Sequence, residues 1–102
     1  LGGRNQELAL AFLAELAHDP RGGQGLHLLA AATDGGDGPT DAAGAFASAA
    51  GLHQARALGL SIETALDRHE SYRFFAATGD LLRLGPTLTN VCDLHLILVE
   101  PG

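Results

Sequence analysis

The chain has 102 residues, 46% of them hydrophobic, and its aromatic residues are one Tyr and four Phe. This length and composition fit a single domain with an aliphatic core and exclude a disordered or fibrous protein. A net charge of −6, with arginine as the only strongly basic residue type, argues against a nucleic-acid or membrane-surface partner.

No apolar run approaches the roughly 20 residues that are needed to cross a bilayer. The single cysteine, Cys92, cannot form an internal disulfide, which fits a reducing compartment. We therefore expect a cytoplasmic protein with no membrane partner. Because the chain opens on Leu1-Gly2-Gly3 and not on methionine, we also expect it to be part of a longer protein.

The first half of the chain predicts a helix followed by a strand. Leucines and Phe12 at helical spacing, with alanine between them, predict a helix from Asn5 to about Ala17. The apolar run from Leu26 to Ala32 is bounded by glycines and predicts a buried strand. The pattern from Ala45 to Ala50 fits either a strand or a helix.

The second half predicts three helices and a closing strand. One helix covers Leu52 to Leu58, a second begins at an N-cap on Ser61, and a third begins at an N-cap on Ser71. The weakly alternating apolar run from Leu94 to Val99 predicts an interior strand.

Polar residues gather in three segments: GGRNQ at residues 2–6, TDGGDGPTDAAGA at residues 33–45 and GPTLTN at residues 85–90. Each segment alone reads more simply as a solvated turn. The first, however, lies at a helix N-terminus, where amide groups and the helix dipole attract anions. Arg4 in this segment could bind a carboxylate or a phosphate through two hydrogen bonds.

The three segments meet only under one topology. The second segment follows the carboxyl end of a strand, which is the usual ligand edge of an open α/β sheet. The third reaches that edge only if 94–99 runs antiparallel to 26–32. We therefore expect an α/β fold, a three-layer domain with a mixed β-sheet flanked by helices.

Familiar binding templates are absent from the sequence. Without lysine there is no phosphate-binding P-loop, and no G-x-G-x-x-G follows a strand. The acidic segment does not match a calcium loop, whereas Mg²⁺ held by one or two carboxylates and substrate phosphates stays open. The histidines show no metal-ligand spacing, so no residue is assigned to a metal. His27 and His95 alternate with leucines and are interpreted as packed, hydrogen-bonded residues.

The stretches GGRNQELAL, TDGGDGPTDAAGA, SYRFF followed by GDLL, and GPTLTNVCDL resemble the C-terminal MOFRL domain of the glycerate 2-kinase class. Some members of that class are labelled hydroxypyruvate reductases. The resemblance runs in order from Gly2 to about Val99. It implies that residues 1–102 are a single domain, the C-terminal part of a two-domain enzyme, without its opening strand or strands.

The resemblance also implies an activity. ATP, with Mg²⁺ in the full-length enzyme, would phosphorylate the 2-hydroxyl of D-glycerate in a cleft between this domain and an N-terminal Rossmann-like domain of the same chain. The catalytic lysine of the family belongs to that other domain, which accounts for its absence here. A fragment with half of the cleft is expected to be inactive alone.

The resemblance assigns residues by position. Arg4 matches an arginine thought to face the substrate or the transferring phosphoryl group, and is predicted to be catalytic. The residues predicted to bind substrate or phosphate are Asn5, Asp34, Asp37, Thr40, Asp41, Thr87, Thr89 and Asn90. The chain departs from the family pattern at Leu88 and Gly36, and at His69-Glu70, where the family has an Asn-rich pair.

Two other functions are kept as alternatives. One is a hydroxypyruvate reductase, as in the labelling of some family members. The other is a non-catalytic module that binds a small acidic metabolite. The small-molecule partner is in each case a hydroxy acid or a related acid, and a homo-oligomer is left open.

Overall fold

The computed structural model describes residues 3–19, 24–32, 42–83 and 93–99. These residues form helices and strands in the order α1 (Arg4–His18), β1 (Leu26–Ala32), β2 (Gly44–Ser48), α2 (Ala49–Ala57), α3 (Ile62–Asp67), α4 (Ser71–Thr78), β3 (Leu81–Leu82) and β4 (Asp93–Val99). Among the described residues, no helix is both long and apolar enough to cross a membrane.

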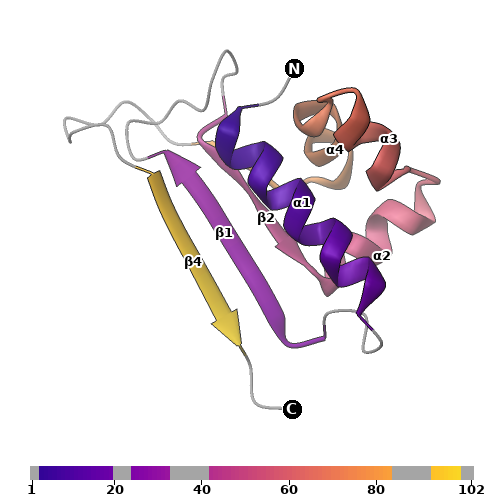
Figure 1. Ribbon diagram of the computed structural model, residues 1–102, viewed down its shortest axis with the longest axis horizontal. Coiled ribbons are helices and arrows are strands. Elements are labelled where there is room, and N and C mark those ends of the chain that lie inside the picture. The colour runs from indigo at the N-terminus through magenta and orange to yellow at the C-terminus, as the bar shows by residue number, and fades with distance from the viewer. Residues whose placement is uncertain (1–2, 20–23, 33–41, 84–92, 100–102) are drawn as a thin grey trace.

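The strands form one sheet in the order β3-β2-β1-β4 (Figure 1). The central strand β1 pairs antiparallel with both neighbours, so that Leu28 lies between Ala47 of β2 and Ile97 of β4. The predicted antiparallel pairing of 26–32 with 94–99 is confirmed. The pair β2 and β3 is antiparallel as well, so the described strands do not include the parallel pair that a mixed sheet would also have.

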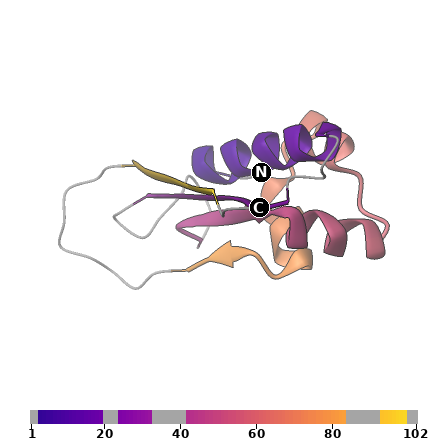
Figure 2. The same cartoon turned by 90° about the horizontal axis from the view of Figure 1, so that it is seen from below.

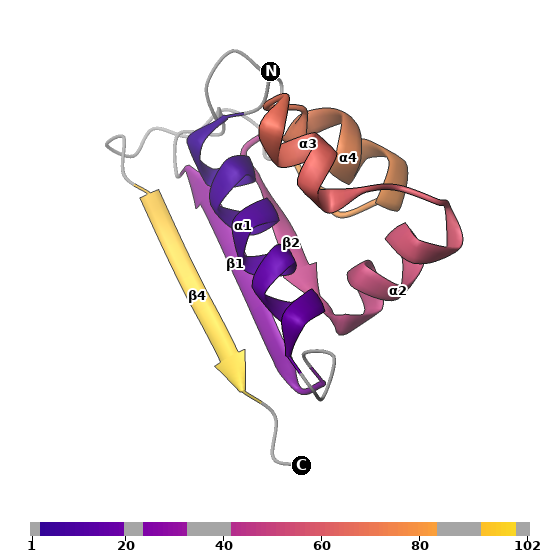
Figure 3. The ribbon, with the colours of Figure 1, turned by 45° about the vertical axis from the view of Figure 1, so that its right-hand side comes forward.

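Helix α1 lies on one face of the sheet (Figure 2), and α2, α3 and α4 gather beside it and beyond β2 (Figure 3). The α/β class is confirmed. Apolar side chains on the other face stay exposed: Phe46 by 41%, Leu96 by 54% and Leu98 by 61%. None of the helices in the described ranges covers that face. The described residues therefore form two of the three expected layers, the sheet and the helices on one side of it.

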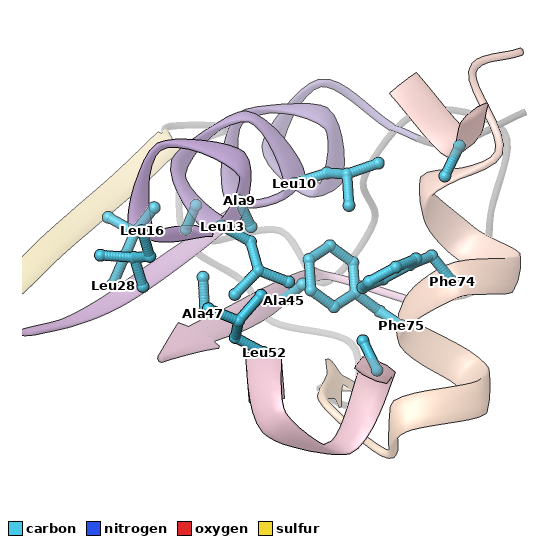
Figure 4. Packing of buried hydrophobic residues seen from close by; sticks show 13 residues of the cluster. Ala9, Leu10, Leu13, Leu16, Leu28, Ala45, Ala47, Leu52, Phe74 and Phe75 are labelled. Carbon is cyan, nitrogen blue, oxygen red and sulfur yellow. The ribbon is translucent and has the colours of Figure 1, made fainter. Parts of the chain in front are cut away.

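The core lies between the sheet and the helices (Figure 4). Alternate residues of a strand point to the same face, and Ala45 and Ala47 of β2 thus meet Leu13 of α1 on this side of the sheet. Phe74 and Phe75 of α4 close the cluster, with their rings edge to face and their centroids 5.3 Å apart. The core is largely aliphatic, as the composition predicts.

The boundaries of several elements follow from local chemistry. Strand β1 has the predicted bounds. The ambiguous stretch 45–50 divides at Ser48, which ends β2 and caps α2 by accepting a hydrogen bond from the Gly51 amide. Ser61 caps α3 as predicted, accepting from the Thr64 amide at 3.1 Å. The prediction for Ser71 is wrong, because Glu70 occupies the N-cap of α4 and Ser71 is its fully buried first residue.

Candidate functional site

The described residues next to the acidic segment and the GPTLTN segment lie at one end of the sheet. Ala32 is the last residue of β1, and its partner across the strands is Asp93, the first residue of β4. The amide of Ala32 also donates to the carbonyl of Ala43 at 2.9 Å, which ties the start of β2 to the same place. The chain therefore leaves β1 toward the acidic segment, and returns from the GPTLTN segment, at neighbouring points.

The first turn of α1 lies at this same end of the sheet (Figure 1). Gly3 is the N-cap and supplies no side-chain cap, so the helical hydrogen-bond ladder begins with the Glu7 amide donating to the Gly3 carbonyl at 2.9 Å. The positive end of the helix dipole lies at this turn and favours an anion. Arg4 is exposed here, so the turn fits a carboxylate or phosphate group.

Asn5 is buried, whereas Arg4, the other predicted site residue on α1, is exposed. Its side chain is fully buried, and its Oδ1 lies 3.0 Å from Nε2 of His95. Because an amide oxygen can only accept, Nε2 of His95 is the donor. Asn5 thus joins the first turn of α1 to β4. The hydrogen-bonded role predicted for His95 is confirmed.

Glu7 places a negative charge in the same turn. Its Oε1 lies 2.9 Å from Nδ1 of His69, which stands between α3 and α4. His69 has a φ of 54°, a left-handed conformation in which Asn, Asp and His are the most frequent residues other than glycine. No local pattern in the sequence indicates this pair, since its partners are 62 positions apart.

The end of the acidic motif is shaped by packing. Ala42 and Ala43 are fully buried. Gly44 lies so close to β1 that an added Cβ would stand 1.8 Å from the Ala30 carbonyl oxygen. The AAG that ends the motif therefore lies where β2 comes close to β1, and only small residues fit there.

The other predicted site residues, Asp34, Asp37, Thr40, Asp41, Thr87, Thr89 and Asn90, lie outside the described residues. Their distances from Arg4 stay predictions, as does a placement of Arg4 and Asp37 on one face. Within the described ranges no group of three or more His, Cys, Asp or Glu side chains could hold a metal ion.

Comparisons with known proteins agree on the relatives of the chain. Residues 1–93 match the model of the MOFRL family. Human glycerate kinase is 47% identical over an alignment of 103 positions, which covers 98% of this chain and 20% of the relative. A protein from Agrobacterium vitis named "Putative hydroxypyruvate reductase" is 45% identical over 96% of this chain and 22% of its own length.

Solved structures agree with the sequence relatives. The crystal structure of a glycerate kinase from Thermotoga maritima has a TM-score of 0.86 and 41% identity, over 97% of this chain and 23% of that one. A structure from Pyrococcus horikoshii OT3 has the same TM-score and 35% identity, over 100% of this chain and 22% of the other. The chain thus spans about a fifth of the length of these proteins, and it belongs to the MOFRL family.

Proposed function

We propose that this chain is the C-terminal domain of a glycerate 2-kinase and lines the cleft in which ATP phosphorylates D-glycerate to 2-phosphoglycerate. The observation that carries the proposal is that the described residues next to the three polar segments lie at one end of the sheet. The pairing of Ala32 with Asp93 and the hydrogen bond between Asn5 and His95 bring their attachment points together. Relatives named glycerate kinase, at 41 to 47% identity, give the reaction its class.

The first turn of α1 supplies the chemistry expected of this site. Glycerate carries a carboxylate, and the transferred group carries several negative oxygens, so phosphoryl transfer depends on positioning and on neutralising charge. The guanidinium of Arg4, which is an exposed residue, and the N-terminus of α1 both favour anions. In this proposal Arg4 is catalytic and contacts the substrate or the transferring phosphoryl group.

The two polar loops complete the proposed wall of the cleft. Asp34, Asp37, Thr40 and Asp41 would line it on one side. Thr87, Thr89 and Asn90 would line it on the other. Mg²⁺, when bound with ATP, would neutralise phosphate charge, and carboxylates of the first loop together with phosphate oxygens are suitable ligands. Asn5 would support the turn from the interior, as its burial suggests.

The open face of the sheet supports a partner within the same polypeptide. Leu29, Phe46, Leu96 and Leu98, with His27, surround a hollow of about 380 Å³ on that face. Exposed apolar surface of this kind is typical of an interface. We propose that an N-terminal Rossmann-like domain of the same cytoplasmic protein completes the enzyme, since the relatives are about five times longer than this chain. In the alternative, the same face would form the interface of a homo-oligomer.

The proposal is tested with an Arg4→Ala variant of the full-length protein. Release of ADP that depends on D-glycerate is measured in the presence of ATP and Mg²⁺. Loss of one electrostatic contact to a developing charge costs about 10²–10³-fold in kcat, and we expect that loss here. Arg73→Ala is the matched control, because the Arg73 side chain is 80% exposed and pairs with Glu70, three residues away, at 3.2 Å. Equal rates in the two variants would contradict the assignment of Arg4.

A second function is favoured by one observation. The name of the Agrobacterium vitis relative assigns it to hydroxypyruvate reduction. In that reading the same anion site would hold the carboxylate of hydroxypyruvate, and the nicotinamide would be bound by the rest of the protein. A non-catalytic module for a small acid would use this site in the same way, without turnover.

A further inference from the structure

The first turn of α1 is held from two sides by histidines. On one side, Nε2 of His95 donates to Oδ1 of the fully buried Asn5. On the other side, Nδ1 of His69 lies 2.9 Å from Oε1 of Glu7. Asn5 and Glu7 belong to the same helical turn as Arg4.

The contact from His95 reaches a buried acceptor. Asn5 is fully buried, so loss of the donor on His95 weakens the pairing of a buried oxygen, and such a loss is costly. His95 stands opposite Ala30 in the sheet register and is therefore held in place by the central strand. The bond fixes the start of α1 against β4, the strand that follows the GPTLTN segment.

The contact from His69 acts on the opposite side of the turn. Glu7 lies in the first turn, where its carboxylate would compete with an anionic ligand for the same positive potential. The hydrogen bond from His69 holds one oxygen of that carboxylate toward the loop between α3 and α4. His69 makes this contact from a left-handed backbone conformation, with a φ of 54°.

We propose that His95 and His69 are positioning residues that fix the first turn of α1 and thereby the guanidinium of Arg4. The inference rests on the proposed function, because it gives Arg4 a role in phosphoryl transfer. Gly3 has no side chain to cap the turn, and the contacts from His95 and His69 support it from neighbouring elements. A displacement of about 1 Å at a reacting group can cost about 10²-fold in rate.

The experiment uses the full-length enzyme and glycerate-dependent ADP release. His95→Leu removes the donor and keeps the apolar character of β4, whereas His95→Gln keeps an N–H donor. His69→Ala removes the second contact, and His69→Asn keeps a donor in a residue that tolerates a positive φ. His53→Leu, at an exposed position of α2, is the matched control.

We expect His95→Leu and His69→Ala to lower kcat about 10- to 100-fold, with KM for ATP changed less than about threefold. His95→Gln and His69→Asn should recover most of the loss, and His53→Leu should match the wild type. In an Arg4→Ala background, His95→Leu should cost less than about twofold more, since both changes disable the same group. An unchanged kcat in His95→Leu, or full additivity with Arg4→Ala, would overturn the proposal.

A second readout separates this inference from the proposed function. If the wild type forms no ADP with glycerate, the proposed function fails, and the contacts are then tested by amide hydrogen exchange over residues 4–10. His95→Leu should accelerate exchange there about tenfold or more relative to His53→Leu, because the first turn loses its anchor on β4. Equal exchange in the two variants would overturn the positioning role.

Discussion

Replacing Gly44 by alanine tests the close approach that ends the acidic motif. A Cβ at this position would stand 1.8 Å from the Ala30 carbonyl oxygen and 2.7 Å from the Ala31 Cα. Both atoms belong to the backbone of β1, the central strand, which pairs with β2 and β4 at once. The added methyl group cannot be accommodated by rotating a side chain, so β1 and β2 must separate.

The magnitude follows from that geometry. Overpacking in a well-packed core costs about 1–3 kcal/mol when side chains can adjust, and backbone atoms give way less easily. We therefore expect Gly44→Ala to lower the free energy of unfolding by about 3 kcal/mol or more. Gly51→Ala is the matched control, because its Cβ would meet only the Asp80 carboxylate, at 2.7 Å. Asp80 can rotate, and alanine is favoured over glycine within a helix by about 0.5–1 kcal/mol.

The assay is native-state hydrogen exchange in the full-length protein, read on the amides of β1. The free energy of opening should fall by about 3 kcal/mol in Gly44→Ala and stay within about 1 kcal/mol of the wild type in Gly51→Ala. A loss below about 1 kcal/mol in Gly44→Ala, or equal losses in both variants, would refute the close approach of β1 and β2.

Three further predictions concern the core, a helix cap and a half-buried carboxylic acid. Phe75→Ala should lower the free energy of unfolding by about 3–5 kcal/mol in denaturant titrations, because Phe75 is fully buried; a loss below 1 kcal/mol would contradict its place in the core. Ser61→Ala should cost about 1 kcal/mol in the same titrations, since the Thr64 amide loses its acceptor, and Ser61→Asp should retain stability. Burial raises the pKa of Asp80 above 3.8, against the opposing hydrogen bond with Thr78. The folded state therefore holds this proton more tightly, and stability falls as pH rises from 3.8 through the raised pKa. Asp80→Asn should reduce this fall in stability-against-pH curves, and an unchanged pH dependence would count against the burial.

The sequence predicted the elements whose signals are local. The run from Leu26 to Ala32 is apolar apart from His27, is bounded by glycines and has the same bounds as β1, because a short apolar run between turn residues is a local signal of a strand. Helix α1 differs from its predicted bounds by one residue at each end. The antiparallel partner of β1 could be predicted only by requiring three polar segments to meet, a constraint from function and not from local pattern.

The parts that the sequence could not predict depend on tertiary contacts. Asn5 reads as a ligand from its place beside Arg4, yet it is buried and bonded to a residue 90 positions away. Ser71 reads as an N-cap by its residue type, but its burial in the contact of α4 with the core overrides that preference. The pair of His69 and Glu7 arises because α1 packs against α3 and α4, which no spacing along the chain reveals.

The central claim is that this chain belongs to a kinase acting on glycerate, and one measurement tests it most directly. The full-length protein is incubated with D-glycerate, ATP and Mg²⁺, and separately with hydroxypyruvate and NADH or NADPH. We predict ADP formation that requires glycerate, with 2-phosphoglycerate as the product and no oxidation of the nicotinamide. Oxidation of the nicotinamide without ADP formation would contradict the claim and assign the site at the start of α1 to a reductase.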